Sequence, residues 1–552
     1  MGFHFQAAFF AFKGSLKPRY NPHLFHPPPT TMFPKLDRIW QIPAVYFILL
    51  TALALATPLT FAPYYQFWLM PLLFGGLVRL IELKPHRAVR SAYWFGFIGY
   101  TAQFWWIHTA LHGIAKLPEY FALPLTLLLP AFLGLYPALA FWLYRHFRLP
   151  RSIGLGIGLP VLWTLTEFAR ERLLTGFGWG ALGYSQIADN SPLAGFAPIG
   201  GIHLVTFATA LVGTWLVLLV NSCAAKPRIA AAIGIASLLL SGCLLRTIAF
   251  TQPTGRPTTV ALAQGNIEQR LKFANSQLVP TYRRYLEQIA STQAQIVLLP
   301  ETAFPVFFQF TAKEIIYDFA QTARDNGSSL AVGVPMITPD GENYLNAVVN
   351  LTDYTPETPP EKLPIYAKNH LVPFGEFKPL KPFTQFLYRS MNIPLGDFQR
   401  GGAAQAPLHM ANQKVAFNIC YEDGFGDELI ASARQATLLA NASNMAWYGD
   451  SNAMWQQLQQ SQTRALELGR YMIRATNTGA TAIVSPQGSI VKQATPNTAT
   501  VLEGSVQGMA GETPFMQLGG SLPLIGLLAA IAGWLKWRFR QPENEQSEFE
   551  HS

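Results

Sequence analysis

Long apolar runs separated by short polar connections dominate the first half of the chain. A helix needs about 20 mostly apolar residues to cross the roughly 30 Å hydrocarbon layer of a membrane. Seven runs in the first 250 residues approach or reach that length, and an eighth lies near the C-terminus. The pattern therefore predicts spanning helices at about 42–59, 64–82, 91–112, 120–143, 151–169, 194–220, 229–249 and 518–537.

Between the seventh and eighth apolar runs, short β-rich runs alternate with stretches of helical periodicity. The predicted strands are 258–263, 296–299, 330–334, 347–351, 415–419, 436–440 and 480–485. The predicted helices include 279–292, 312–324 and 453–468. Alternation of this kind is typical of a layered α/β domain.

These patterns divide the chain into five segments. We expect a disordered N-terminal extension at 1–40, a seven-helix transmembrane domain at 41–250 and an α/β domain at 251–517. A C-terminal transmembrane helix at 518–540 and a tail at 541–552 follow. The extension is rich in proline and has no cleavable signal pattern, and Met32 is an alternative start.

The distribution of charged residues predicts how these segments are oriented across the membrane. Charged residues make up 13% of the chain, against a usual share of about 25%, and the net charge is +9. The basic residues cluster at the ends of apolar runs, so membrane topology explains them better than nucleic-acid binding. The bias of basic loops toward the cytoplasm predicts that both termini are cytoplasmic and that 251–517 lies on the other side. In a Gram-negative cell this side is the periplasm, and the membrane is the inner membrane.

Three side chains suited to covalent acyl chemistry each follow a strand-like run. Glu301 follows Ile-Val-Leu-Leu-Pro, Lys368 follows Tyr-Ala, and Cys420 follows Val-Ala-Phe-Asn-Ile. Functional side chains converge at strand ends in α/β folds. A thiol supplies a nucleophile, a carboxylate a general base, and an ammonium a stabiliser of an oxyanion. Glu376 is positioned in the sequence either to hold Lys368 or to support Glu301.

Cys420 is the single cysteine of the α/β region. It precedes Tyr421, Glu422 and Asp423, in a predicted turn into a helix. The N–H groups at a helix start favour a thiolate, but the neighbouring acids oppose it, so a cation is needed. Cys223 and Cys243 lie in or beside apolar helices, where small apolar packing explains them, and no cysteine spacing indicates a metal site or a disulfide framework.

The order Glu301, Lys368, Cys420 resembles the catalytic triad of the nitrilase superfamily. Longer motifs resemble the apolipoprotein N-acyltransferase family more closely: LPETA at 299–303, KNHLVPFGE at 368–376, CYE at 420–422 and NASN at 441–444. One departure is Phe273, where the family often carries tryptophan.

The resemblance implies a multi-pass α-helical membrane bundle of about eight helices joined to an α/β nitrilase-like αββα sandwich. It also implies transfer of an acyl chain from a phospholipid, with phosphatidylethanolamine the expected donor, through a Cys420 thioester. The acceptor is then the N-terminal amine of a diacylglyceryl-cysteine on an apolipoprotein. Glu301, Lys368 and Cys420 are the implied catalytic residues, and Glu376, Tyr421 and Glu422 the supporting ones, with no cofactor, no metal and no nucleic acid.

Two alternatives remain at this stage. A membrane-anchored amidase would use the same triad on small amides, although one helix would suffice as its anchor. A transporter or scaffold with an inert α/β domain is less consistent with the few charged residues inside the apolar runs. The apolar residues of 374–398 and 447–455 further suggest a lid that dips into lipid.

Overall fold

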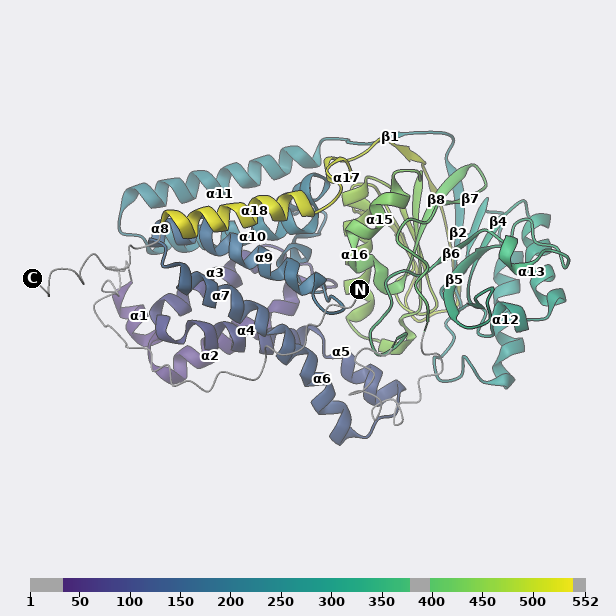
Figure 1. Cartoon of the computed structure of the whole chain (residues 1–552), viewed down its shortest axis with the longest axis horizontal. Helices are drawn as coiled ribbons and strands as arrows, with labels where there is room; N and C mark the ends of the chain where they lie inside the picture. The colour runs from purple at the N-terminus through teal and green to yellow at the C-terminus, as the bar shows by residue number, and fades with distance from the viewer. Residues whose placement is uncertain (1–32, 378–397, 540–552) are drawn as a thin grey trace, which may run out of the picture.

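The protein is described by a computed structural model that covers residues 33–377 and 398–539. Figure 1 shows a helical bundle at one end and an α/β sandwich at the other. The predicted extension up to residue 32, most of the suggested lid (378–397) and the predicted tail at 541–552 lie outside the described residues.

The helical bundle is built from the apolar runs of the sequence. Its main helices are α2 (Pro43–Ala56), α3 (Leu69–Leu83), α4 (Ala88–Gln103), α6 (Glu119–Leu133), α7 (Leu135–Phe147), α9 (Leu159–Arg172), α10 (Ala197–Asn221), α11 (Ala225–Arg246) and α18 (Leu522–Arg538). Five helical stretches are long and apolar enough to cross a membrane: Pro43–Thr60, Glu119–Phe147, Arg151–Arg172, Pro192–Asn221 and Ala225–Arg246. Helices α3, α4 and α18 have 15, 16 and 17 residues, which is shorter than the roughly 20 residues that a spanning helix needs. The protein is therefore a multi-pass membrane protein, and the count of eight spans stays a prediction.

Two details of the bundle differ from the sequence prediction. Residues within the expected disordered extension form a helix, α1 (Pro34–Trp40), and its buried Asp37, paired with Arg79, attaches it to α3. The predicted span at 91–112 is also interrupted. Helix α4 ends at Gln103, whose backbone carbonyl accepts a hydrogen bond from Gln456 Nε2 of the sandwich at 3.2 Å, and a π-helical turn (Thr109–Ile114) follows.

The sandwich contains two six-stranded sheets. The first has the order β13-β2-β3-β4-β5-β6, and the second the order β12-β11-β10-β9-β8-β7. The first comprises β2 (Thr258–Gln264), β3 (Ile296–Leu298), β4 (Ser329–Ile337), β5 (Tyr344–Asn350), β6 (Ile365–Ala367) and β13 (Thr500–Val506). The second comprises β7 (Leu408–Met410), β8 (Gln413–Ile419), β9 (Leu438–Ser443), β10 (Met472–Thr476), β11 (Ala482–Val484) and β12 (Ile490–Gln493).

Helices cover the outer faces of both sheets. Residues such as Leu262 of the first sheet and Phe417 of the second share one buried cluster, so the main core lies between the sheets. Helices α12 (Asn275–Ala290) and α13 (Lys313–Asp325) pack on the first sheet, and α15 (Gly426–Ala433) and α16 (Ala453–Leu468) on the second. The predicted αββα sandwich beside a membrane bundle is confirmed.

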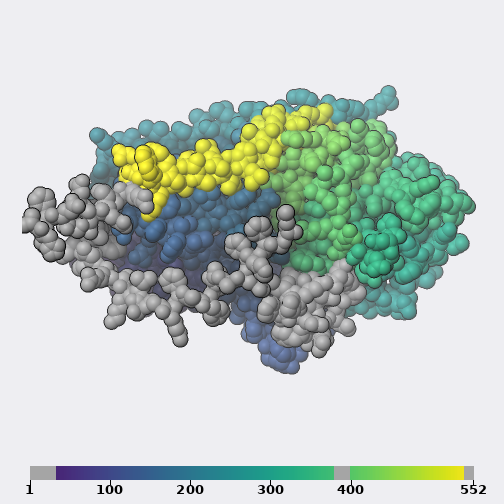
Figure 2. Space-filling view, viewed as in Figure 1, coloured from purple at the N-terminus to yellow at the C-terminus, as the bar shows by residue number. Residues whose placement is uncertain are grey.

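The sandwich meets the bundle mainly through α16. Glu467 Oε1 accepts a hydrogen bond from the backbone N–H of Ile202 in α10 at 2.7 Å, and Gln459 Oε1 accepts one from Ala62 at 3.1 Å. The chain then leaves the sandwich through α17 (Pro514–Gln517), and α18 runs back along the surface of the bundle (Figure 2). The two parts are thus joined by polar contacts and by two chain crossings.

Candidate active site

The structure brings the three candidate residues together. Glu301 follows β3, Lys368 follows β6 in the same sheet, and Cys420 follows β8 in the opposing sheet. Lys368 Nζ lies 3.7 Å from Glu301 Oε1. Both residues are buried, with Glu301 8% and Lys368 1% exposed, and the charges of both act on the thiol of Cys420. The site therefore lies where the ends of the two sheets meet.

Glu301 is held by the backbone around it. Gly333 of β4 passes so close that a Cβ atom there would lie 2.3 Å from Pro300 O and 2.7 Å from Glu301 Cα. Lys272, which is fully buried, donates a hydrogen bond from Nζ to the backbone carbonyl of Glu301 at 3.2 Å. Burial lowers the pKa of Lys272 to about 7, although Glu301 opposes this change. This turn is consequently fixed from two sides.

Lys368 is held by two carboxylates. Its Nζ donates to Glu376 Oε1 at 2.9 Å, and Asn346 Nδ2 donates to both Glu376 Oε1 at 2.9 Å and Glu301 Oε1 at 2.8 Å. Burial opposes the charged lysine, but Glu376 and then Glu301 outweigh it, so the pKa of Lys368 is raised. Both roles considered for Glu376 are therefore met: it binds Lys368 directly and Glu301 through Asn346.

Cys420 adopts a left-handed backbone conformation, with φ at +53°, at the junction of β8 and a short 3-10 helix (Cys420–Gly424). Such a conformation is uncommon for a residue other than glycine and is found at functional sites. Burial and then Glu301 raise the pKa of the Cys420 thiol to about 12, and Lys368 and Gln457 oppose this rise. Burial thus outweighs the lowering of the thiol pKa that was expected from the helix start. The resting form of Cys420 at neutral pH is therefore the thiol.

This raised pKa makes the alkylation of Cys420 strongly pH-dependent. Iodoacetamide reacts with the thiolate, so the rate should rise about tenfold per pH unit from pH 7 to 9.5 without a plateau. The check is the labelling rate of the peptide that contains Cys420, measured by mass spectrometry on the full chain in detergent. A rate that bends near pH 8.5 and levels off above it, as for a cysteine with an ordinary pKa of about 8.5, would contradict this description of the resting site.

Glu422 joins the cysteine strand to the lysine loop. Its Oε1 accepts hydrogen bonds from the backbone N–H groups of Asn369 at 2.7 Å and His370 at 2.9 Å. Its Oε2 accepts from the N–H of Ile419 at 2.7 Å and from Tyr366 Oη at 2.9 Å. Because these donors flank both Lys368 and Cys420, Glu422 fixes the two catalytic candidates relative to each other.

A loop of the bundle touches both of these segments. Thr175 O lies 3.1 Å from His370 Nε2, and Gly176 O accepts a hydrogen bond from Tyr421 Oη at 2.9 Å. His370 also lies 2.9 Å from Glu428 through Nδ1 and stacks on the ring of Phe425. These contacts give His370 a structural role, and the bundle contacts the residues adjacent to Lys368 and Cys420.

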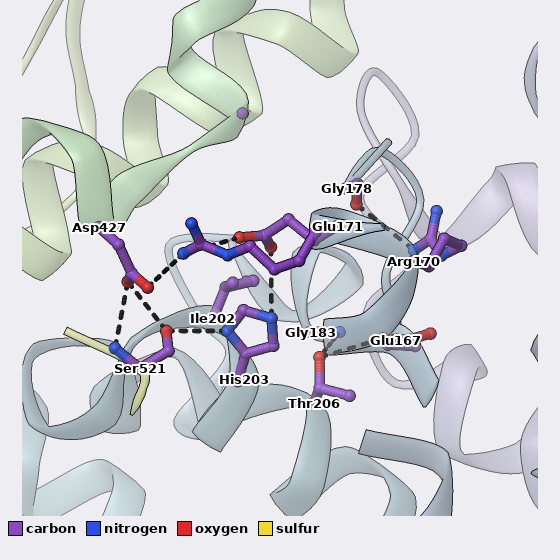
Figure 3. A network of polar contacts seen from close by, with 12 residues as sticks. Glu167, Arg170, Glu171, Gly178, Gly183, Ile202, His203, Thr206, Asp427 and Ser521 are labelled. Atoms are coloured by element: carbon purple, nitrogen blue, oxygen red, sulfur yellow. Dashed lines mark hydrogen bonds and ion pairs between the residues drawn. The ribbon is translucent and has the colours of Figure 1, made fainter. Parts of the chain in front are cut away.

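A buried polar network extends this connection into the bundle (Figure 3). Glu171 of α9 pairs with His203 Nε2 of α10 at 3.3 Å, and His203 Nδ1 lies 2.9 Å from Ser521 Oγ. Ser521, just before α18, donates from its hydroxyl to Asp427 Oδ1 of α15 at 3.0 Å, and Arg172 pairs with the same carboxylate. The network joins three bundle helices to the sandwich beside the catalytic candidates.

Sequence reasoning missed three polar residues at the site: Asn346, Gln457 and Arg474. Asn346 lies on β5 and bridges the two acids, whereas Gln457 and Arg474 lie on α16 and β10 behind Cys420. A buried arginine within an apolar strand, Met-Ile-Arg-Ala-Thr, was an available signal, because such a charge requires partners. Within residues 33–377 and 398–539, no group of three His, Cys, Asp or Glu side chains is arranged to hold a metal ion.

Comparison with known proteins assigns both parts of the chain to families. Residues 53–215 match the family described as apolipoprotein N-acyltransferase N-terminal domain, and residues 259–515 match carbon-nitrogen hydrolase. An apolipoprotein N-acyltransferase of Neisseria meningitidis serogroup B is 61% identical over 93% of this chain and 100% of its own length. The chain belongs to the apolipoprotein N-acyltransferase family.

Other members of the apolipoprotein N-acyltransferase family are similar over comparable lengths. The relative from Chromobacterium violaceum is 48% identical over 90% of this chain and 96% of its own. The relative from Nitrosomonas europaea is 39% identical over 89% and 97%. These matches confirm the resemblance drawn from the motifs and identify the chain as a membrane-bound acyltransferase with a nitrilase-type domain.

Proposed function

We propose that this protein transfers a fatty acyl chain from a membrane phospholipid to the N-terminal amine of a diacylglyceryl-cysteine on an apolipoprotein. The observation that carries the proposal is the grouping of buried Glu301 and Lys368 with the half-buried Cys420, joined to a membrane bundle that contacts residues beside them. The names of the relatives support the acceptor. Phosphatidylethanolamine is the proposed donor.

The first half-reaction acylates the enzyme. Glu301 takes the thiol proton as the sulfur of Cys420 attacks the carbonyl carbon of the lipid ester, and the carbonyl electron pair moves to oxygen. Lys368, kept charged by Glu376, stabilises this oxyanion. As the intermediate collapses, the bond to the glycerol oxygen breaks, and that oxygen takes the proton from Glu301. A lysophospholipid leaves and a thioester remains.

The second half-reaction deacylates the enzyme. The α-amine of the lipoprotein attacks the thioester carbonyl, and Glu301 accepts the amine proton. The carbon–sulfur bond then breaks, and the sulfur leaves and regains a proton from Glu301. Splitting one acyl transfer into two steps lets one site serve two lipid substrates in turn.

The same proposal covers the orientation of the chain. The catalytic domain at 251–517 is placed in the periplasm, and both termini in the cytoplasm of a cell with an inner membrane. Basic residues support this orientation, because Arg151 lies between α7 and α9, and Lys536 lies in the last turn of α18, the end of that helix away from the sandwich. There Arg151 pairs with Glu82 at 2.6 Å and donates to Ser222 at 3.0 Å, and Lys536 donates to the carbonyl of His146 at 3.1 Å.

The test uses the full chain in detergent with phosphatidylethanolamine and a synthetic diacylated lipopeptide. We expect equal amounts of N-acylated lipopeptide and lysophospholipid by mass spectrometry. A lipopeptide whose amine is already acetylated is the control and should yield no triacylated product. Release of ammonia from small amides, without acyl transfer to the lipopeptide, would instead favour an amidase and overturn the proposal.

A further inference from the structure

The side chain of Gln457 touches the reactive sulfur. It lies on α16, is 1% exposed, and places Nε2 at 3.6 Å from Cys420 Sγ. An amide has a donor and an acceptor end, and the two ends look alike by shape alone. Which end faces the sulfur therefore has to be decided from the other partners of the amide.

Arg474 decides the orientation. Its Nη2 lies 2.5 Å from Gln457 Oε1, and a guanidinium can only donate hydrogen bonds. The oxygen of the amide must therefore face Arg474, which leaves the N–H₂ group toward Cys420. The reverse orientation would place two donors against each other inside a buried site, at the cost of an unmade bond.

Arg474 is itself immobilised. Its Nη1 donates to Asp423 at 2.9 Å, Asn441 at 2.7 Å and Ser461 at 3.1 Å, and neither Arg474 nor Asp423 is exposed. The cation thus polarises the Gln457 amide from behind, which strengthens its N–H as a donor toward the sulfur. A row of fixed groups, from Asp423 through Arg474 and Gln457, ends at the thiol.

We propose that Gln457 is a further catalytic residue, which stabilises the negative charge on Cys420 Sγ whenever the sulfur is a thiolate. This inference rests on the proposed function. The thiolate character appears as Glu301 takes the proton during the attack of the sulfur, and again as the carbon–sulfur bond breaks in the second half-reaction. A neutral thioester sulfur is a much weaker acceptor. Gln457 therefore stabilises the thiolate-like states that precede and follow the acyl-enzyme more than it stabilises the acyl-enzyme itself. This difference accelerates both half-reactions.

The test removes the hydrogen-bond donor of the Gln457 side chain and keeps its approximate shape. Gln457→Met keeps the length of the side chain and removes the N–H group. Gln457→Glu keeps the oxygen that binds Arg474 and puts a negative charge beside the sulfur. Gln459→Met is the matched control, because Gln459 is equally buried on α16 but binds Ala62 and Ile187 at the bundle instead of the sulfur.

The readout is the rate at which iodoacetamide alkylates Cys420 in the full chain at pH 8.5. We expect Gln457→Met to slow it about three- to fourfold, because a thiol pKa one unit higher lowers the thiolate fraction tenfold and makes the remaining thiolate about threefold more nucleophilic. Gln457→Glu should slow it further, and Gln459→Met should stay within about twofold of the parent. Acyl-enzyme formation from phospholipid should fall in the same order.

Alkylation at the parental rate in Gln457→Met and Gln457→Glu, with thermal unfolding midpoints near that of the parent, would overturn the role of Gln457. If Gln457→Met does not fold, Gln457→Glu alone decides, because its carboxylate retains the Arg474 contact. A chain that forms no acyl-enzyme at all would instead refute the proposed function. The alkylation comparison would still report on the contact between Gln457 and the sulfur, so the two failures are distinguishable.

Discussion

Cys420→Ala is expected to abolish acyl transfer, with kcat lowered by at least about 10³-fold. The reason is that the proposed mechanism carries the acyl chain on Cys420, and removal of a nucleophile leaves only binding and electrostatic effects. The measurement is the rate of lipopeptide acylation with purified full-length protein. Replacing a methylene-bound sulfur by a hydrogen in a partly buried position should leave the thermal unfolding midpoint nearly unchanged.

Cys243→Ala provides the matched control for that variant. Cys243 lies on α11 among the bundle helices, and its side chain is exposed on the surface of the bundle. This variant should retain full activity. Parental activity in Cys420→Ala would contradict the covalent mechanism, because it would show that the thioester is unnecessary.

Glu301→Gln should affect catalysis and thiol reactivity in opposite directions. The amide oxygen can still accept the hydrogen bond from Asn346, but the side chain can no longer take a proton, so acyl transfer should fall about 10³-fold. The negative charge of Glu301 raises the pKa of Cys420, so its removal should make alkylation of Cys420 faster. Acylation assays and iodoacetamide labelling of the same preparation check both effects.

Comparing Glu376→Gln with Glu301→Gln distinguishes the proposed general base, Glu301, from the carboxylate that holds Lys368, Glu376. Glu376 binds Lys368 but has no assigned proton transfer, so its variant should lose far less activity, about tenfold. If Glu301→Gln and Glu376→Gln lose activity equally, Glu301 is only a charge partner of Lys368. If Glu301→Gln slows both acylation and alkylation, damage to the structure explains the loss.

The grouping of Cys420, Glu301 and Lys368 was predictable because each lies just after a strand within a distinctive local motif. Glu376 and Glu422 were predictable for the same reason, since each lies within a few residues of Lys368 or Cys420 in the chain. Asn346 and Gln457 were not, because their contacts with Glu301 and Cys420 cross 45 and 37 residues of sequence. No local pattern specifies which strand or helix of a sandwich passes behind a given residue.

The protonation state of Cys420 was beyond the reach of the sequence for a related reason. A helix start and a nearby lysine both favour a thiolate, and both features are present. Their effect is outweighed by burial and by the charge of Glu301, which depend on the packing of the whole site. The structure therefore assigns a resting thiol that needs its base, in place of a preformed thiolate.

In the bundle, hydropathy located the helices but not their ends. The apolar run at 91–112 continues past Gln103, yet α4 stops there, where the sandwich supplies a donor to its last carbonyl. Residues 34–40 lie outside the apolar runs, yet they form a helix whose Asp37 pairs with Arg79 of α3 in a buried ion pair. Tertiary contacts thus set the boundaries that composition leaves open.

The covalent step can be observed without the acceptor. Intact mass spectrometry of the full chain after incubation with phosphatidylethanolamine alone should show a gain of one acyl group, removed by hydroxylamine and absent in Cys420→Ala. No mass gain in the parent protein while it still acylates the lipopeptide, or an adduct that persists in Cys420→Ala, would contradict the claim that the sulfur of Cys420 carries the acyl chain.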